Sequence, residues 1–178
     1  AAALTVTSNP PGINLGSSAT FAPTPSAGTN VRAAEFSSIT IGSTGQTLVS
    51  NVTLAPVDRA TFRPTVLVAS SLSIPTAPSP ALSGFLDLGN GDLVLKGGAA
   101  SESTIRSYVK AWLDSGTTKV GLGAGSATAL TTLAVFSNDS GYGFAETASF
   151  SGVSVNAADL LVKFTYLGDT NIDGVIDA

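Results

Sequence analysis

An acidic run at the end of the chain has the residue types and spacing most suited to chemistry. Counting Asp169 as position 1 of a loop, oxygen-bearing side chains fall at positions 1, 3, 5 and 9, with Gly174 at position 6 for a sharp bend. A hard cation such as Ca²⁺ takes about six to eight oxygen ligands, and this spacing is that of an EF-hand-type loop. The run therefore predicts a calcium site formed by Asp169, Asn171, Asp173, the carbonyl of Val175, and Asp177.

The loop lacks one ligand within this sequence. EF-hand loops carry a bidentate acid at position 12, which would be residue 180, after Ala178. We therefore expect weak calcium binding by this chain. The competing interpretation is a solvated Asp/Asn turn without a metal, because these residues are also common turn formers.

The same residues carry a family resemblance. Residues 168–177 are similar to the first calcium half-loop of type I dockerins, and the run from Val162 onward resembles the junction that closes passenger-like repeats in large secreted bacterial proteins. In those proteins such segments follow autotransporter-associated β-strand repeats, and residues 86–95, LDLGNGDLVL, resemble the last repeat before the junction. The resemblance covers about residues 31–177 and implies a secreted, extracellular or cell-surface protein. A dockerin needs a second half-loop to bind a cohesin, and this chain lacks one.

Composition favours a secreted β-rich protein. Hydrophobic residues make up 43% of the 178 positions but charged residues only 11%, so Ser and Thr must supply much of the polar, solvated surface.

The net charge of −4 argues against nucleic-acid partners and anionic membrane surfaces. The absence of His removes the commonest general base and most zinc sites. The absence of Met fits a mature chain after removal of a signal peptide. No apolar run reaches the ~18 residues of a membrane span.

Short segments that alternate apolar residues with Ser or Thr predict an all-β fold. Two pieces repeat: residues 37–41 recur at 70–74, and residues 19–24 recur at 60–65. The offsets differ by eight, so we expect residues 25–35 to form a loop that the second copy lacks. Stacked repeats favour a short parallel β-solenoid, and a β-sandwich or jelly roll is the alternative.

One helix is expected after residue 100. Ile105, Val109, Trp112 and Leu113 form a stripe at helical spacing, and Gly116 follows as a C-terminal cap. Ser101 or Ser103 is the expected N-terminal cap. We interpret the stripe as facing the core, so that the helix is a lid over strand edges at one end of the β-rich part.

The remaining expectations concern the domain organisation. The Gly-rich residues 121–125 are expected in a loop, and not in a phosphate-binding one, because no Lys-Ser/Thr follows them. Residues 150–155 are expected to form one strand. The sequence divides into a β-rich repeat region (1–98), the capping helix with closing strands of the same domain (99–167) and the partial dockerin-like loop (168–178).

The leading functional hypothesis is a non-catalytic extracellular structural protein. It would be a self-assembling module of a bacterial surface layer, filament or adhesin, with a calcium-binding C-terminal loop. Few charges keep copies apart, and the strand expected at residues 4–7 has no charged guard, so we expect a homo-oligomer or filament formed by docking of that strand.

Two alternatives belong to other classes. A polysaccharide lyase of the β-solenoid kind would use acidic side chains with a basic one, and the candidates are Asp87, Asp92, Arg59, Arg63 and Lys96. A polysaccharide-binding module would need aromatic platforms, for which Trp112 and Tyr142 are available.

The calcium hypothesis predicts that Asp173→Ala lowers calcium affinity steeply, because position 5 supplies a carboxylate to the ion. Isothermal titration of the wild type and the variant measures this effect. A wild-type chain that gives no calcium heat even at millimolar concentrations would show that the run is only a turn.

Overall fold

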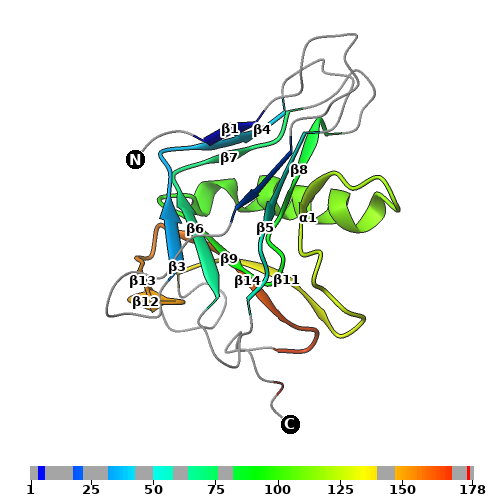
Figure 1. Ribbon diagram of the computed structural model, residues 1–178. Coiled ribbons are helices and arrows are strands. Elements are labelled where there is room, and N and C mark those ends of the chain that lie inside the picture. Colours follow the sequence, from blue (N-terminus) through cyan, green and yellow to red (C-terminus); the bar gives the residue numbers. More distant parts are fainter. Residues whose placement is uncertain are drawn as a thin grey trace.

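The computed structural model describes residues 4–6, 18–21, 32–42, 50–57, 64–75, 82–139, 147–169 and 176 (Figure 1). It is mostly β, with several sheets and one short α-helix. The prediction of an all-β chain with a single helix is confirmed at this level.

The strands of the described residues form three larger sheets and one hairpin. Sheet A contains β1 (Leu4–Val6), β4 (Ile39–Ile41) and β7 (Leu72–Ser73). Sheet B contains β2 (Ser18–Phe21), β5 (Ser50–Leu54), β8 (Gly84–Asp87) and β10 (Gly121–Gly123). Sheet C contains β3 (Arg32–Glu35), β6 (Thr65–Ala69), β9 (Asp92–Leu95), β14 (Leu160–Tyr166) and β11 (Thr131–Ser137). The hairpin contains β12 (Ser149–Phe150) and β13 (Val153–Ser154), and the helical elements are η1 (Ala99–Ser101) and α1 (Glu102–Asp114).

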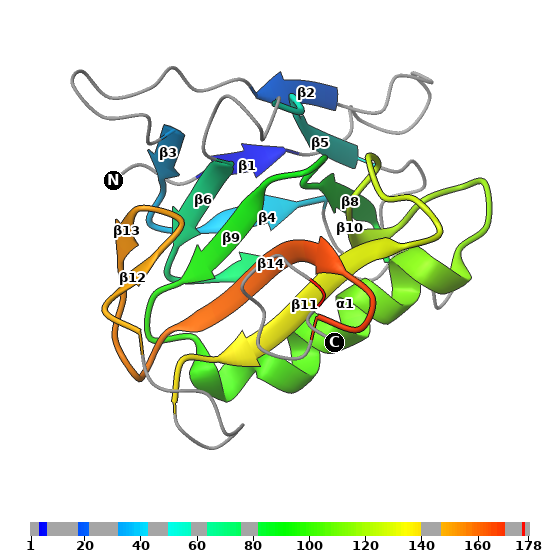
Figure 2. The ribbon, with the colours of Figure 1, turned by 90° about the horizontal axis from the view of Figure 1, so that it is seen from below.

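The chain passes through sheets A, B and C in that order three times, and we call each pass a coil. Equivalent strands of successive coils pair in parallel. Ile39 pairs with Leu72 and Thr40 with Ser73, so the repeated residues 37–41 and 70–74 lie in register, 33 positions apart. Figure 2 shows β3, β6 and β9 side by side in sheet C.

The second sequence repeat is not matched by the strand pairing of the described residues, and residues 60–63 of its later copy lie outside them. Ala19 pairs with Val52, 33 positions further on, so residues 19–21 do not align with the similar residues after position 59. Residues 32–35 are also not a loop, because they form β3. Arg-Ala-Ala-Glu has little intrinsic β preference, and its extended form comes from pairing with β6.

The interior of the coils is one apolar cluster built from stacked side chains. Val52, Leu86 and Leu122 are aligned across sheet B by register, and all three are buried. Ile39 and Leu72 are aligned in the same way in sheet A. Each inner side chain therefore rests on its counterpart in the next coil, which is how a repeat that cannot bury its face alone gains a core.

Sheet C is buried on both faces. Leu67, Leu93 and Val162 belong to the interior cluster, whereas their neighbours Val66, Val94 and Leu161 form a second cluster on the outer face. The β12–β13 hairpin covers this outer face with Phe150, Val153 and Val155. Burial on both sides explains why β6 and β9 are buried at every position and do not alternate.

Residues 150–155 therefore are not one strand. Ser151 and Gly152 both have positive φ, 50° and 89°, and this pair of left-handed residues is the requirement of a tight hairpin turn.

Helix α1 crosses the end of the third coil. Ile105 is buried in the interior cluster, and the Tyr108 hydroxyl accepts a hydrogen bond of 3.3 Å from the N–H of Ile74, just after β7. Gly121 and Gly123 let the helix approach β10 closely, since a Cβ at Gly123 would lie 1.9 Å from the Trp112 ring. The Gly-rich segment was thus wrongly expected to be a loop: residues 121–123 form β10, with its glycines against the helix.

The helix ends agree only in part with the sequence pattern. Gly116 has φ +58° after the last turn, as a C-terminal cap requires. Ser101 is the N-cap residue, but its side chain makes no capping hydrogen bond. Trp112 is 9% exposed, whereas Leu113 is 65% exposed and does not belong to the core-facing stripe.

Trp112→Ala should lower the free energy of unfolding by about 3–5 kcal/mol, because it leaves a cavity beneath the helix. The neighbouring Leu113→Ala is the matched control and should have a much smaller effect, because that side chain already meets solvent. Urea unfolding of both variants measures the difference. Equal effects would mean that α1 is not packed through Trp112.

Candidate functional site

The predicted calcium ligands fall mostly outside the described residues. Asn171, Asp173, Val175 and Asp177 lie there, and only Asp169 is described. Asp169 is 8% exposed, its carboxylate accepts a hydrogen bond from the Thr165 hydroxyl, and its N–H donates to the Tyr166 carbonyl at 3.2 Å. The first residue of the predicted loop is therefore held against the end of β14. Calcium binding by the loop stays a prediction.

The two acids proposed for a lyase lie on different sheets. Asp87 ends β8, and its Oδ1 accepts hydrogen bonds from the N–H groups of Gly89 (2.8 Å) and Gly125 (2.5 Å). This carboxylate therefore holds the corner after β8 against the loop after β10. Residues 89–91 lie in this corner, which leads from sheet B to sheet C.

Asp92 is fully buried on β9. Its Oδ1 accepts the N–H of Phe164 at 3.0 Å, and its Oδ2 accepts the hydroxyl of Ser151 at 2.5 Å. Asp92 thus ties the hairpin turn to sheet C. The other basic candidates, Arg59 and Arg63, lie outside the described residues.

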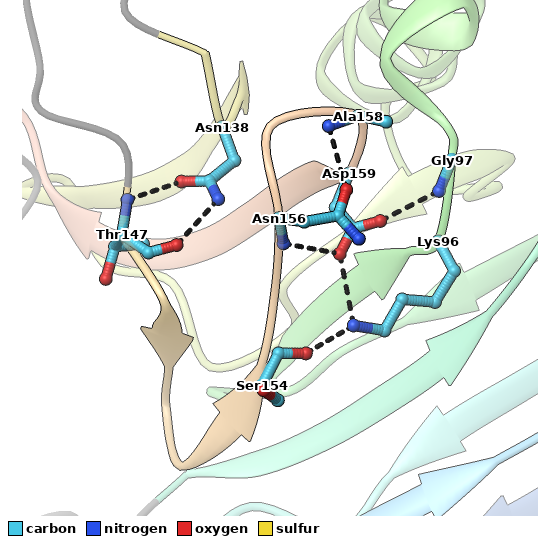
Figure 3. Close-up of polar contacts among 8 residues, drawn as sticks. All are labelled: Lys96, Gly97, Asn138, Thr147, Ser154, Asn156, Ala158 and Asp159. Atoms are coloured by element: carbon cyan, nitrogen blue, oxygen red, sulfur yellow. Dashed lines mark hydrogen bonds and ion pairs between the residues drawn. The ribbon is translucent and has the colours of Figure 1, made fainter.

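The best-defined polar site surrounds Asp159, just before β14 (Figure 3). Its side chain is 1% exposed. Oδ1 accepts the N–H of Gly97 at 2.8 Å, and Oδ2 accepts the N–H of Asn156 at 3.0 Å and pairs with Lys96 Nζ at 3.1 Å. Lys96 also donates to the carbonyl of Ser154. One carboxylate therefore joins the end of β9, the end of the hairpin and the start of β14.

These contacts keep Asp159 ionised. Burial raises the pKa of its carboxyl group, but the hydrogen bond from Gly97, the hydrogen bond and charge of Lys96, and the hydrogen bond from Asn156 outweigh burial. The net effect holds the pKa below its ordinary value of 3.8. An ionised carboxylate with these donors is suited to binding cations and N–H groups, and the groups bound here belong to the protein itself.

Asn138 makes a second polar contact with the hairpin segment (Figure 3). It is 4% exposed, its amide donates to the carbonyl of Thr147 at 2.8 Å, and its Oδ1 accepts the Thr147 N–H at 3.1 Å. The sequence reasoning did not single out Asn138 or Asp159 as site residues. Asp159 could have been found from its place directly before the apolar run Leu160-Leu161-Val162. A carboxylate next to a buried strand is itself buried, and a buried charge needs a partner.

Trp112 is not an open platform for a sugar. Its ring meets Phe85 edge-on, with 5.5 Å between ring centroids, and the Lys119 ammonium lies 5.2 Å from the centroid of the Trp112 ring. A mainly apolar hollow of about 120 Å³ lies beside it, between α1, β10 and the start of β11. Tyr142, the other proposed platform, lies outside the described residues.

Comparison with family models, curated proteins and solved structures gave no match to this chain. Among the helices of the described residues, none is long and apolar enough to cross a membrane.

Asp159→Asn should lower the free energy of unfolding at pH 7 by about 1–3 kcal/mol, the usual cost of disrupting hydrogen bonds to a buried charged group. Because the folded pKa lies below 3.8, the contribution of the carboxylate is present above the unfolded pKa and is lost as the pH falls below 3.8. The difference between wild type and variant should therefore shrink as the pH falls below 3.8 toward the lower folded pKa, as measured by urea unfolding.

Asp114→Asn provides a control for the Asp159 measurement. It removes an ion pair with Lys110 on the exposed side of α1, where solvent screens the charges, so it should change stability little. A wild-type advantage over Asp159→Asn that does not change with pH would contradict the role of the ionised carboxylate.

Proposed function

We propose that this chain is a non-catalytic extracellular structural protein, a self-associating β-solenoid module of a bacterial surface layer, filament or adhesin. The observation that carries the proposal is the parallel, in-register pairing of equivalent strands over three coils in sheets B and C, where the first and second coils are 33 residues apart. Sheets of a β-sandwich or jelly roll pair antiparallel strands, so this pairing favours a solenoid over that alternative. A solenoid is a scaffold that grows by addition of like units, which suits a structural role.

The lyase alternative is weakened by the contacts of its candidate residues. Asp87, Asp92 and Lys96 all hold backbone or side-chain groups of the protein itself. A catalytic acid or base must be able to reach the proton it transfers on a substrate. The polysaccharide-binding alternative is weakened in a similar way by the burial of Trp112.

Self-association is proposed to use the first coil. In the described part of the chain, β1, β2 and β3 each pair with a strand on one side only. At the opposite end, β7, β10 and β11 are edge strands as well, but α1 packs against β10 and β11 and covers that end. Contact through the first coil therefore joins two copies, and a filament or layer needs a second contact elsewhere.

The calcium loop is proposed as the second functional element. Asp169 is attached to β14 through Thr165, so an ion bound by the loop would be coupled to the end of sheet C. The loop would connect the β-rich module to a partner such as a cohesin, or to a further segment of a surface protein. Cohesin binding would require a second half-loop.

Deletion of residues 1–8 should abolish self-association, because it removes β1 from the open end of the coils. Light scattering across a concentration series measures the oligomer distribution. Leu113→Ser, at the end covered by α1, is the control and should leave association unchanged. A full-length chain that stays monomeric at high concentration, or a deletion that leaves assembly intact, would rule out docking through the first coil.

A further inference from the structure

The β12–β13 hairpin is joined to the rest of the protein in an unusual way. Its two strands have two residues each and, among the described residues, pair only with each other. One further backbone hydrogen bond, from Val155 N–H to the Ala148 carbonyl, lengthens the hairpin without linking it to sheet C. No strand ladder of the described chain therefore holds the hairpin in place.

The hairpin covers an apolar surface that is separate from the coil interior. Phe150, Val153 and Val155 pack on the outer face of sheet C, over Val66, Val68, Val94 and Leu161. Phe150 also meets Phe136 of β11 edge-on, with 6.2 Å between centroids. None of these residues belongs to the interior cluster that contains Ile105 of α1.

Polar contacts attach the hairpin at its turn and at both ends. Asp92 holds the turn through Ser151, and Asn138 holds the incoming backbone at Thr147. The outgoing backbone is held at Ser154 by Lys96 and at Asn156 by Asp159. Figure 3 shows Lys96 between Ser154 and Asp159, so one ion pair fixes the whole outgoing end.

We propose that the hairpin is a strap that opens as one unit, ahead of the coil core, when the charge of Asp159 is lost, and that opening uncovers the valine-rich outer face of sheet C. Loss of the charge weakens the ion pair with Lys96 and the two charge-assisted hydrogen bonds at once. The outgoing end is then released. The interior cluster and α1 keep their contacts, because the strap does not contribute to them.

Other charged groups lie on the elements that meet at this site. In the described residues they are Asp92 on β9, Lys163 on β14, Asp139 after β11, and Glu102, Arg106, Lys110 and Asp114 on α1, of which Lys110 and Asp114 pair with each other. Asp92 binds Ser151 and Phe164, and Glu102 binds Ser137 and Arg106. Lys96 is the cation that forms an ion pair with Asp159. Asp92 holds the turn, so it is the release of the outgoing end that is assigned to the Asp159–Lys96 pair.

Hydrogen exchange with mass spectrometry at pH 7 tests the strap in the full chain. In Asp159→Asn, peptides covering 147–156 should exchange about tenfold faster or more, whereas peptides covering β6 and α1 should keep wild-type rates, as local opening requires. Asp114→Asn is the matched control and should leave all three regions unchanged. Equal acceleration of all regions, or an unchanged hairpin, would overturn the proposal.

An acid titration of the wild type tests the same opening without a mutation. Binding of the dye ANS should rise as the pH falls below 4, before the fluorescence of Trp112 changes, because Trp112 reports on α1 and the hairpin lies on sheet C. Lys96→Met should move the rise in dye binding to higher pH. Simultaneous changes of dye and Trp112 would show that the strap and the core open together, and would overturn the proposal even if Asp159→Asn fails to fold.

Discussion

Backbone hydrogen bonding between parallel strands of successive coils is the constraint on which the structure depends. Because the strands lie in register, an inner side chain at one position rests on the inner side chain of the equivalent strand, as Val52 rests on Leu86. The apolar core is thus a set of stacked columns, and a shift of one residue in any strand would turn its inner side chains to the outside. Small differences in connection length can be absorbed between strands, which is why β9 follows β6 at a shorter offset than β6 follows β3.

The stack of coils has two ends, and only the end at the third coil is covered by a helix of the described residues. At the third coil, α1 places Ile105 into the interior, and its close approach to β10 depends on Gly121 and Gly123. The helix therefore covers the end of the interior and presents its other side to solvent, as a capping element of stacked units must. The strands at both ends are edge strands, but α1 packs against β10 and β11 at the third coil, whereas no helix of the described residues lies across β1, β2 and β3 at the first coil. This asymmetry leads us to place self-association at the first coil and to expect that contact to join pairs of copies.

Sheet C combines two roles because both of its faces are buried. Its inner face belongs to the coil interior, and its outer face carries the hairpin, so the sheet is the central layer of three. The polar side chains Asp92 and Asp159 lie where the hairpin meets this sheet, and each is satisfied by backbone or side-chain donors of the protein. These buried carboxylates fix the position of the hairpin on the sheet. In any other arrangement a charged group would be buried without a hydrogen-bond or ion-pair partner. The hairpin is consequently fixed by a few polar contacts over an apolar surface, a combination that can be released without disrupting the coils.

The sequence by itself determined the all-β character, the single helix with its Gly116 cap and the in-register repeat of residues 37–41 and 70–74. These features follow from local periodicity, from the left-handed conformation that glycine allows, and from identical patterns that stack in identical ways. The sequence also predicts a calcium loop from the spacing of its oxygen-bearing residues, and of the predicted ligands only Asp169 lies within the described residues. Only the tertiary structure decided that residues 32–35 and 121–123 are strands, since pairing with β6 and the approach of α1 override their weak intrinsic preferences. It likewise decided that Leu113 faces solvent and that Asp159 is a buried ion-pair partner, because these depend on which distant segments, such as the end of β9 and the hairpin, are brought against each side chain.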